Sequence, residues 1–191
     1  MSSHRLTAGL GRMRSRFDRA IVASRYGRHG IEAVNERLLT AYRVEAVLAE
    51  YGAQVGDDVV VHGPLVIHNA ELDYSNLTIA DHVHIGRLSV IDLAGPVSVE
   101  AFATVSMGAT ILTHTDVGES PLRARLPRSV AGTRIGEASY LGANATILPG
   151  CHVGSHAVVG ASALVNRPVP DGTTVAGVPA RPVAEQSAGE R

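Results

Sequence analysis

The side chains of this chain that could do chemistry are mainly histidines. Its 191 residues include nine histidines, one cysteine and no lysine, so all 17 basic residues are arginines. The lack of lysine excludes a Schiff-base lysine and the lysine of a phosphate-binding loop. A single cysteine, Cys151, excludes an intrachain disulfide and a cysteine-based zinc cage. Histidine remains, and near neutral pH it can serve as a general base or as a metal ligand.

Composition predicts a soluble globular protein. Apolar residues make up 45% of the chain and charged residues 18%, enough to build a core. The net charge of -1 argues against nucleic acid as a partner. The N-terminus lacks the apolar segment of a secretory signal, and no stretch approaches the roughly 20 apolar residues of a membrane span. We therefore expect a cytoplasmic protein without integral membrane association.

The elements that must position the histidines are revealed by a six-residue period. From Val55 onward an aliphatic residue recurs at every sixth position, with Asp73 as an exception. The series comprises Val55, Val61, Ile67, Ile79, Ile85 and Ile91, then after a two-residue slip Val99, Val105 and Ile111, and after an interruption Ile135, Leu141, Ile147, Val153, Val159 and Val165. This hexapeptide repeat predicts a parallel β-helix, because a β-sandwich would show a period of two instead.

Further patterns divide the chain into segments. Residues 1–54 are predicted to be helical, with one or two amphipathic helices over about 12–30 and 31–50 and a break marked by Gly27 and Gly30. The β-helix is expected to span 55–183, all-β in its core. Residues 115–132 leave the register and predict an extruded loop, which in a tight repeat is usually functional. Residues 184–191 are expected to form a flexible tail.

The run IGEASYLGANATILPGCHVGSHAVVGASALVNRPVPDGTTVAGVPARPV resembles the C-terminal coils of bacterial hexapeptide-repeat acyltransferases. Galactoside, maltose and Nod-factor O-acetyltransferases and serine acetyltransferase belong to this superfamily. The resemblance covers about Val55 to Val183, and its most specific stretch is the AGVPAR ending after a VPDG turn. It implies a left-handed β-helix, a homotrimer, and acetyl transfer from acetyl-CoA at clefts between subunits.

The same resemblance assigns roles to single residues. His114, just before the extruded loop, matches the catalytic histidine that takes the proton of an acceptor hydroxyl. The resemblance does not assign the acceptor side, for which the candidates are Asp92, just before the slip in the repeat, His84 and Asp116. Asp92 could reach toward His114 or the acceptor, or it could bond local backbone only.

The coenzyme positions of the family fall on four residues. Ala143 and Ala161 match small residues along which pantetheine runs, although corner packing would explain them equally well. Asn166 stands where several relatives carry threonine. Arg181 matches an arginine near the nucleotide phosphates, for which a guanidinium is well suited. No metal is expected.

Other functions stay open. Carbonic-anhydrase-like β-helix enzymes bind zinc through three histidines, two of them five residues apart. No pair has that spacing among the seven histidines of the repeat region: His62, His68, His82, His84, His114, His152 and His156. A non-catalytic scaffold is the other alternative. For an acyltransferase, the acceptor is expected to be a small molecule such as a sugar or a natural product, and an amine acceptor is possible.

Overall fold

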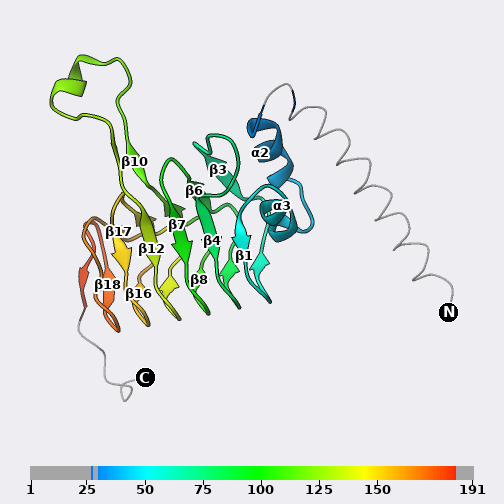
Figure 1. The fold of residues 1–191 in the computed structure, drawn as a ribbon. Coiled ribbons are helices and arrows are strands. Elements are labelled where there is room, and N and C mark those ends of the chain that lie inside the picture. Colours follow the sequence, from blue (N-terminus) through cyan, green and yellow to red (C-terminus); the bar gives the residue numbers. More distant parts are fainter. Residues whose placement is uncertain (1–26, 28–29, 184–191) are drawn as a thin grey trace, which may run out of the picture. The chain divides into compact units, whose positions relative to one another are not determined.

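The chain forms a left-handed parallel β-helix, seen in a computed structural model that describes residue 27 and residues 30–183. Five coils each contribute three strands, one to each of the three faces of a prism (Figure 1). The first strand of every coil lies on face A, the second on face B and the third on face C. The coils in order are β1 (Gln54–Val55), β2 (Val60–Val61) and β3 (Val66–His68); β4 (Leu77–Ile79), β5 (His84–Ile85) and β6 (Val90–Asp92); β7 (Val97–Val99), β8 (Thr104–Val105) and β9 (Thr110–Ile111); β12 (Thr133–Ile135), β13 (Tyr140–Leu141) and β14 (Thr146–Ile147); and β15 (His152–Val153), β16 (Val158–Val159) and β17 (Leu164–Val165). The predicted fold class is confirmed.

The six-residue period is the stacking register of these coils. On face A, Ile79 pairs with Val99, which pairs with Ile135, and the other two faces repeat the pattern with the remaining markers. Every aliphatic marker except Val55 is buried. The small residues four positions after the markers, such as Ala103 and Cys151, are buried at the corners. One branched side chain per strand therefore fills the prism, and only small side chains fit beside it.

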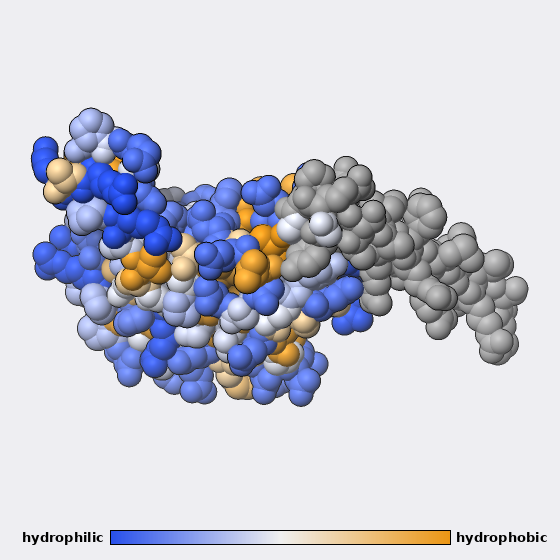
Figure 2. All heavy atoms as spheres, turned by 45° about the horizontal axis from the view of Figure 1, so that its top comes forward, coloured by the Kyte–Doolittle hydropathy of each residue, from blue (hydrophilic) through white to orange (hydrophobic). Residues whose placement is uncertain are grey.

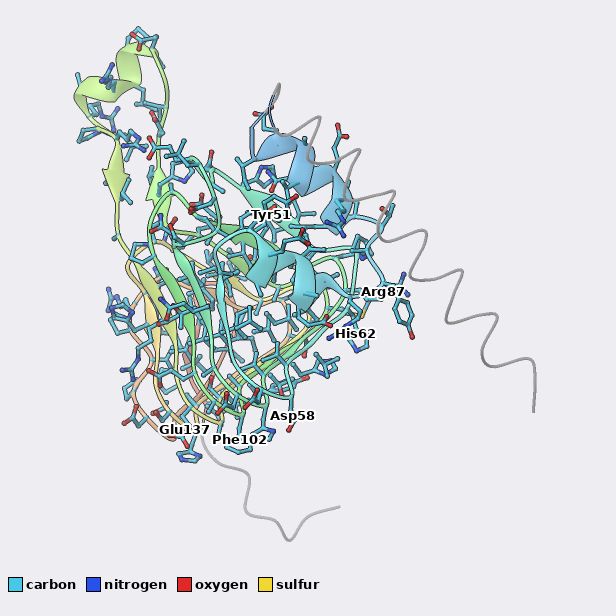
Figure 3. The ribbon with its side chains drawn as sticks, turned by 45° about the vertical axis from the view of Figure 1, so that its right-hand side comes forward. Tyr51, Asp58, His62, Arg87, Phe102 and Glu137 are labelled. Atoms are coloured by element: carbon cyan, nitrogen blue, oxygen red, sulfur yellow. The ribbon has the colours of Figure 1, made fainter. Side chains whose placement is uncertain are left out.

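The edges between the faces are columns of stacked turns. At the A–B edge a residue with positive φ recurs on each coil, including Asp58, Phe102 and Ala138. The N–H of Phe102 donates to the Asp81 carbonyl on the coil before, and neighbouring turns repeat this bond. Figure 3 shows Asp58, Phe102 and Glu137 along this edge. Equivalent positions on successive coils therefore form straight columns, so residues far apart in sequence lie side by side.

The irregular position Asp73 belongs to an excursion from the coil. Because Val55 pairs with Ile79, 24 residues separate these two neighbours, whereas 18 separate Ile135 from its partner Val153. The six extra residues lie in the segment 69–76, between β3 and β4. Asp73 accepts a hydrogen bond from the Ser75 N–H there, 2.8 Å, instead of filling the core. Segment 69–76 leaves the prism at the C–A edge.

The helical segment differs from the prediction. In place of one helix over 31–50 the chain forms α2 (Glu32–Leu38) and α3 (Val44–Glu50). Leu38 and Val44 are both fully buried, yet they lie six residues apart, about 120° from alignment on one continuous helix. A break after Leu38 lets each helix orient its own apolar residues, and it leaves Leu39 and Tyr42 exposed. Gly30, one of the two glycines expected to mark a break, has a φ of +62° and lies just before α2. The helix expected over 12–30 lies almost wholly outside the described residues, as does the tail 184–191.

The predicted loop leaves the helix between the third and fourth coils. It starts with β10 (His114–Thr115), continues through the 3-10 helix η1 (Pro121–Ala124) and returns as β11 (Ser129–Val130). β10 and β11 pair antiparallel, with His114 opposite Val130, and form a narrow neck. The loop projects away from the coils (Figure 1). In Figure 2 it is mostly hydrophilic, with a hydrophobic patch on the coils at its base.

Both ends of the stack are covered. At the first coil, α3 packs against β1 and β2. At the last coil, β18 (Thr174–Ala176) pairs with β16 and then antiparallel with β19 (Arg181–Pro182). The N–H of Leu164 in β17 donates to the Gly177 carbonyl, and its carbonyl accepts from the Ala180 N–H. A helix therefore covers the first coil, and the chain turns back over the strands of the last one.

Candidate active site

The site is built where the C–A edge meets the neck of the loop. Asp92 ends β6 on the second coil, and His114 follows β9 on the third. β6 and β9 pair in parallel, which stacks the two corners on each other. His114 Nδ1 lies 2.6 Å from Asp92 Oδ2. Of the interpretations left open for Asp92, the structure therefore shows the carboxylate reaching His114.

The Asp92 carboxylate is buried and surrounded by donors. Its side chain is 2% exposed, and Oδ2 also accepts from the N–H groups of Thr113 and His114, at 2.8 and 3.0 Å. Oδ1 accepts from Asn69 Nδ2 at 2.8 Å and from the Ala94 N–H at 3.3 Å. Burial by itself favours the neutral acid, but the hydrogen bonds from His114, Asn69 and Thr113 outweigh it. Together they lower the pKa of Asp92 to about 2.

This environment orients the imidazole. An ionised carboxylate can only accept hydrogen bonds, so the Nδ1 of His114 must carry a hydrogen. In a neutral ring the lone pair then lies on Nε2, the nitrogen that faces away from Asp92. The His114 side chain is 25% exposed, so a reactant can approach it. A histidine held in one tautomer by a buried carboxylate is the arrangement of a general base.

The loop side chains pair mainly with one another. Asp116, predicted to bind acceptor, accepts from the Gly118 N–H at 2.8 Å and lies 3.4 Å from the Arg128 guanidinium. Arg123 lies 3.4 Å from Glu119, one turn before it. Asp116 therefore stands two residues beyond His114, on the neck, where it joins the two sides of the loop.

The third residue predicted to bind acceptor lies elsewhere. His84 is in β5 on face B, where its ring centroid is 4.9 Å from that of His62. Figure 3 shows His62 well away from the base of the loop. Within one chain His84 is therefore not brought to the Asp92–His114 pair.

The predicted coenzyme residues divide between two edges. Ala143 and Ala161 stack on the B–C edge, where the Ser162 N–H donates to the Ala143 carbonyl at 2.8 Å. Arg181 is exposed in β19, directly after Ala180, which bonds to β17 at the end of the same edge. Asn166 is exposed on the C–A edge, two coils beyond the corner that follows β9. The B–C edge thus brings Ala143, Ala161 and Arg181 together, whereas Asn166 lies on the edge that carries His114.

Sequence reasoning missed the partners of Asp92. Asn69 and Thr113 contact its carboxylate from the first and third coils, 23 and 21 residues away. That Asn69 lies beside Asp92 follows only once the length of the excursion 69–76 is known, because β3 pairs with β6 at an offset of 24 residues. The signal that could have found Asn69 is a polar residue directly after a repeat strand on the coil before Asp92.

The described residues hold three further findings. Residues 30–183 contain no group of three or more His, Cys, Asp or Glu side chains that could bind a metal ion. No helix in this part of the chain is long and apolar enough to cross a membrane. Cys151 is buried, and burial raises the pKa of its thiol.

Comparisons with known proteins agree with this architecture. Residues 132–167 match the family described as bacterial transferase hexapeptide (six repeats). The chain is 31% identical over 110 residues to the Escherichia coli K12 protein named "Putative lipopolysaccharide biosynthesis O-acetyl transferase WbbJ", covering 56% of each chain. It is 44% identical over 61 residues to the 2,3,4,5-tetrahydropyridine-2,6-dicarboxylate N-acetyltransferase of Staphylococcus aureus RF122 / ET3-1, covering 32% of this chain and 26% of that protein. It thus spans about half or less of the length of these curated relatives.

A solved structure shares the fold. The acetyltransferase domain of PglB from Neisseria gonorrhoeae FA1090, in complex with acetyl coenzyme A, is similar with a TM-score of 0.53 and 28% identity. The match covers 69% of this chain and 52% of that one.

Proposed function

On the premise that this chain carries the hexapeptide repeat of bacterial transferases, we propose that it moves an acetyl group from acetyl-CoA to a hydroxyl group of a small molecule. The observation that carries the proposal is the 2.6 Å contact between the buried Asp92 carboxylate and His114 Nδ1. The likeness to WbbJ, named as an O-acetyl transferase, and to an acetyl-CoA-bound domain supports the reaction class.

The reaction requires one proton acceptor beside the hydroxyl. The acceptor oxygen attacks the carbonyl carbon of the thioester while His114 Nε2 takes its proton, because an unassisted hydroxyl is a poor nucleophile at neutral pH. A tetrahedral intermediate forms, and its carbon–sulfur bond then breaks. CoA leaves as a thiolate, and the imidazolium returns the proton to the sulfur. Asp92 stays ionised throughout and stabilises the imidazolium.

We assign acetyl-CoA binding to the B–C edge and the end of the stack. Ala143 and Ala161 have small side chains, which leave room for the extended pantetheine arm to lie against the backbone of this edge. Gly142 lies close against the backbone of Ala161 on the neighbouring coil. Arg181 is exposed and is proposed to bind phosphate. Asn166 contributes from the C–A edge. Because these residues occupy two edges, a complete pocket requires a neighbouring copy of the chain.

A homotrimer in the cytoplasm completes the proposal. The exposed faces of the prism differ in character: face A presents Ser98, Arg134 and His152, whereas face B presents Tyr140 and Val158, which pair on adjacent coils and are 44% and 36% exposed. Such apolar side chains on a regular face are typical of surfaces that bind another subunit. In that arrangement His84, which lies on face B, would reach the site of a neighbouring copy rather than its own.

The acceptor is proposed to be a sugar or a natural-product hydroxyl, with His84 and Asp116 contributing to its binding. The alternative is an amine, for which the same base would serve, and the match to an N-acetyltransferase over 61 residues supports it. The two acceptor classes are separated by supplying hydroxyl and amine acceptors to the same enzyme.

The test is the release of CoA thiol from acetyl-CoA in the presence of a panel of hydroxyl and amine acceptors. His114→Ala should lower turnover by roughly 10²–10⁴-fold and leave acetyl-CoA binding almost unchanged. His156→Ala is the matched control, because His156 is also exposed but lies on the A–B edge, where Ala138 already occupies the equivalent position and no proposed site residue lies. A His114 variant that keeps most of its turnover would contradict the proposal.

A further inference from the structure

Asn69 is the one side chain outside the third coil that bonds the carboxylate of Asp92 in the described structure. It directly follows β3, and its Nδ2 lies 2.8 Å from Asp92 Oδ1. Its backbone φ is +56°, in the left-handed region that asparagine tolerates better than most residues. The backbone turn at this point aims the amide across the C–A edge at the neighbouring coil.

The rest of segment 69–76 holds this turn against the same corner. Asn76 Nδ2 donates to the carbonyl oxygen of Leu93, at 3.0 Å. The N–H of Leu93 donates in turn to the His68 carbonyl, at 2.8 Å. The first residue of the excursion therefore bonds to Asp92 and its last residue to Leu93, so only the first contacts the carboxylate.

The two oxygens of Asp92 have different tasks. Oδ2 accepts from His114 and from backbone N–H groups, whereas Oδ1 accepts from Asn69 and, at the longer distance of 3.3 Å, from Ala94. Without the Asn69 amide, Oδ1 would keep one long hydrogen bond in a buried position. The carboxylate would then lose a charge-assisted bond and part of the constraint on its rotation about the Cβ–Cγ bond.

We propose that Asn69 is a positioning residue for the catalytic pair, forming with Asp92 and His114 a hydrogen-bonded line across three successive coils. It fixes the carboxylate plane so that Oδ2 faces Nδ1 of His114, and it stabilises the ionised form with a neutral donor that does not compete for the proton. The lowered pKa of Asp92, to which the Asn69 hydrogen bond contributes, agrees with this role. The catalytic part of this inference rests on the proposed function.

The variant Asn69→Gly removes the amide and keeps the left-handed turn, because glycine adopts positive φ without strain. Asn76→Ala is the matched control: it removes the other amide that anchors segment 69–76 but leaves the carboxylate contacts in place. Two quantities are measured: steady-state turnover with acetyl-CoA, and the pKa of the Asp92 carboxyl from a ¹³C NMR titration assigned with Asp92→Asn.

Asn69→Gly should lower kcat on the order of tenfold, since a hydrogen bond to a charged group is lost, with the KM for acetyl-CoA unchanged. It should also raise the pKa of Asp92 from about 2 toward its ordinary value. Asn76→Ala should change neither quantity. Asn69→Asp, which matches the shape but adds a like charge, should raise the carboxyl pKa further.

The inference is overturned if Asn69→Gly matches Asn76→Ala in turnover, or if the Asp92 pKa does not move. A fall in kcat that both variants share would also overturn it, because segment 69–76 would then act through the fold alone. The titration needs no turnover. If His114→Ala keeps its activity, the proposed function fails while the link between Asn69 and Asp92 is still tested.

Discussion

Replacing Asp92 by asparagine removes the charge of the catalytic pair and keeps most of its shape. The amide oxygen of the new side chain can still accept from His114 Nδ1, while its NH₂ group takes the place of Oδ1. There it meets Asn69, whose own amide can rotate to present its oxygen. Only the weak bond from the Ala94 N–H, 3.3 Å in the wild type, then lacks an acceptor. Asp92→Asn therefore tests charge rather than packing.

The size of the stability effect follows from the pKa. A fall from 3.8 to about 2 corresponds to about 2 kcal/mol of additional stability in the folded state at neutral pH. The folded-state pKa is depressed, so this contribution is fully present above about pH 4 and is lost as the pH falls toward 2. Asp92→Asn should accordingly unfold with about 2 kcal/mol less free energy at pH 7, and the difference from wild type should shrink below pH 4.

The catalytic effect should be larger than the structural one. Without the carboxylate charge the imidazolium that forms during proton transfer loses its stabilisation, so kcat should fall roughly 10²–10⁴-fold. Urea unfolding at pH 7 and at acid pH measures the first effect, and thiol release from acetyl-CoA measures the second. Full turnover in Asp92→Asn would refute the assigned role, and an unchanged stability difference across the acid range would refute the assigned pKa.

Three further predictions concern the coenzyme site and the stack. Arg181→Ala should raise the KM for acetyl-CoA and leave kcat at saturation nearly unchanged, with Arg43→Ala, at the residue before α3, as the control; unchanged KM would remove Arg181 from the site. Gly142→Ala should destabilise the fold by more than 1 kcal/mol in urea unfolding, because a Cβ there would lie 2.5 Å from the Ala161 backbone nitrogen; wild-type stability would show that the coils can separate at this edge. Cys151 should resist a thiol reagent in the native state and react after unfolding, since it is buried and its pKa is raised; rapid native modification would show that this corner opens.

The period of the sequence predicts the stack because each marker faces the same narrow interior. Ile85 and Ile147 belong to different faces, yet both need a branched side chain of similar volume, so the pattern survives every corner. The excursion 69–76 escaped prediction for a related reason. The excursion adds six residues, the length of one repeat, so the six-residue period continues through it undisturbed. Only the backbone pairing of Val55 with Ile79 shows that Asp73 does not occupy a strand of the prism.

The site was predictable in part. Resemblance to a family identified His114, and position in the repeat placed Asp92 near it. The network around Asp92 was not predictable, because the hydrogen bond from Asn69 depends on which corner stacks on which. The break between α2 and α3 escaped as well, since apolar spacing of three and four continues across a change of helix direction.

The covered ends of the stack have a consequence for solubility. A parallel β-helix grows by adding one coil to an identical edge, so two bare ends would be templates for head-to-tail polymerisation into fibres. The antiparallel return of β19 onto β18 presents a strand of opposite direction, to which another parallel coil cannot be added in register. The bonds of Gly177 and Ala180 to Leu164 occupy the backbone groups of β17 that a new coil would use. The last seven described residues, 177–183, therefore form a cap that prevents the addition of a further coil from another molecule.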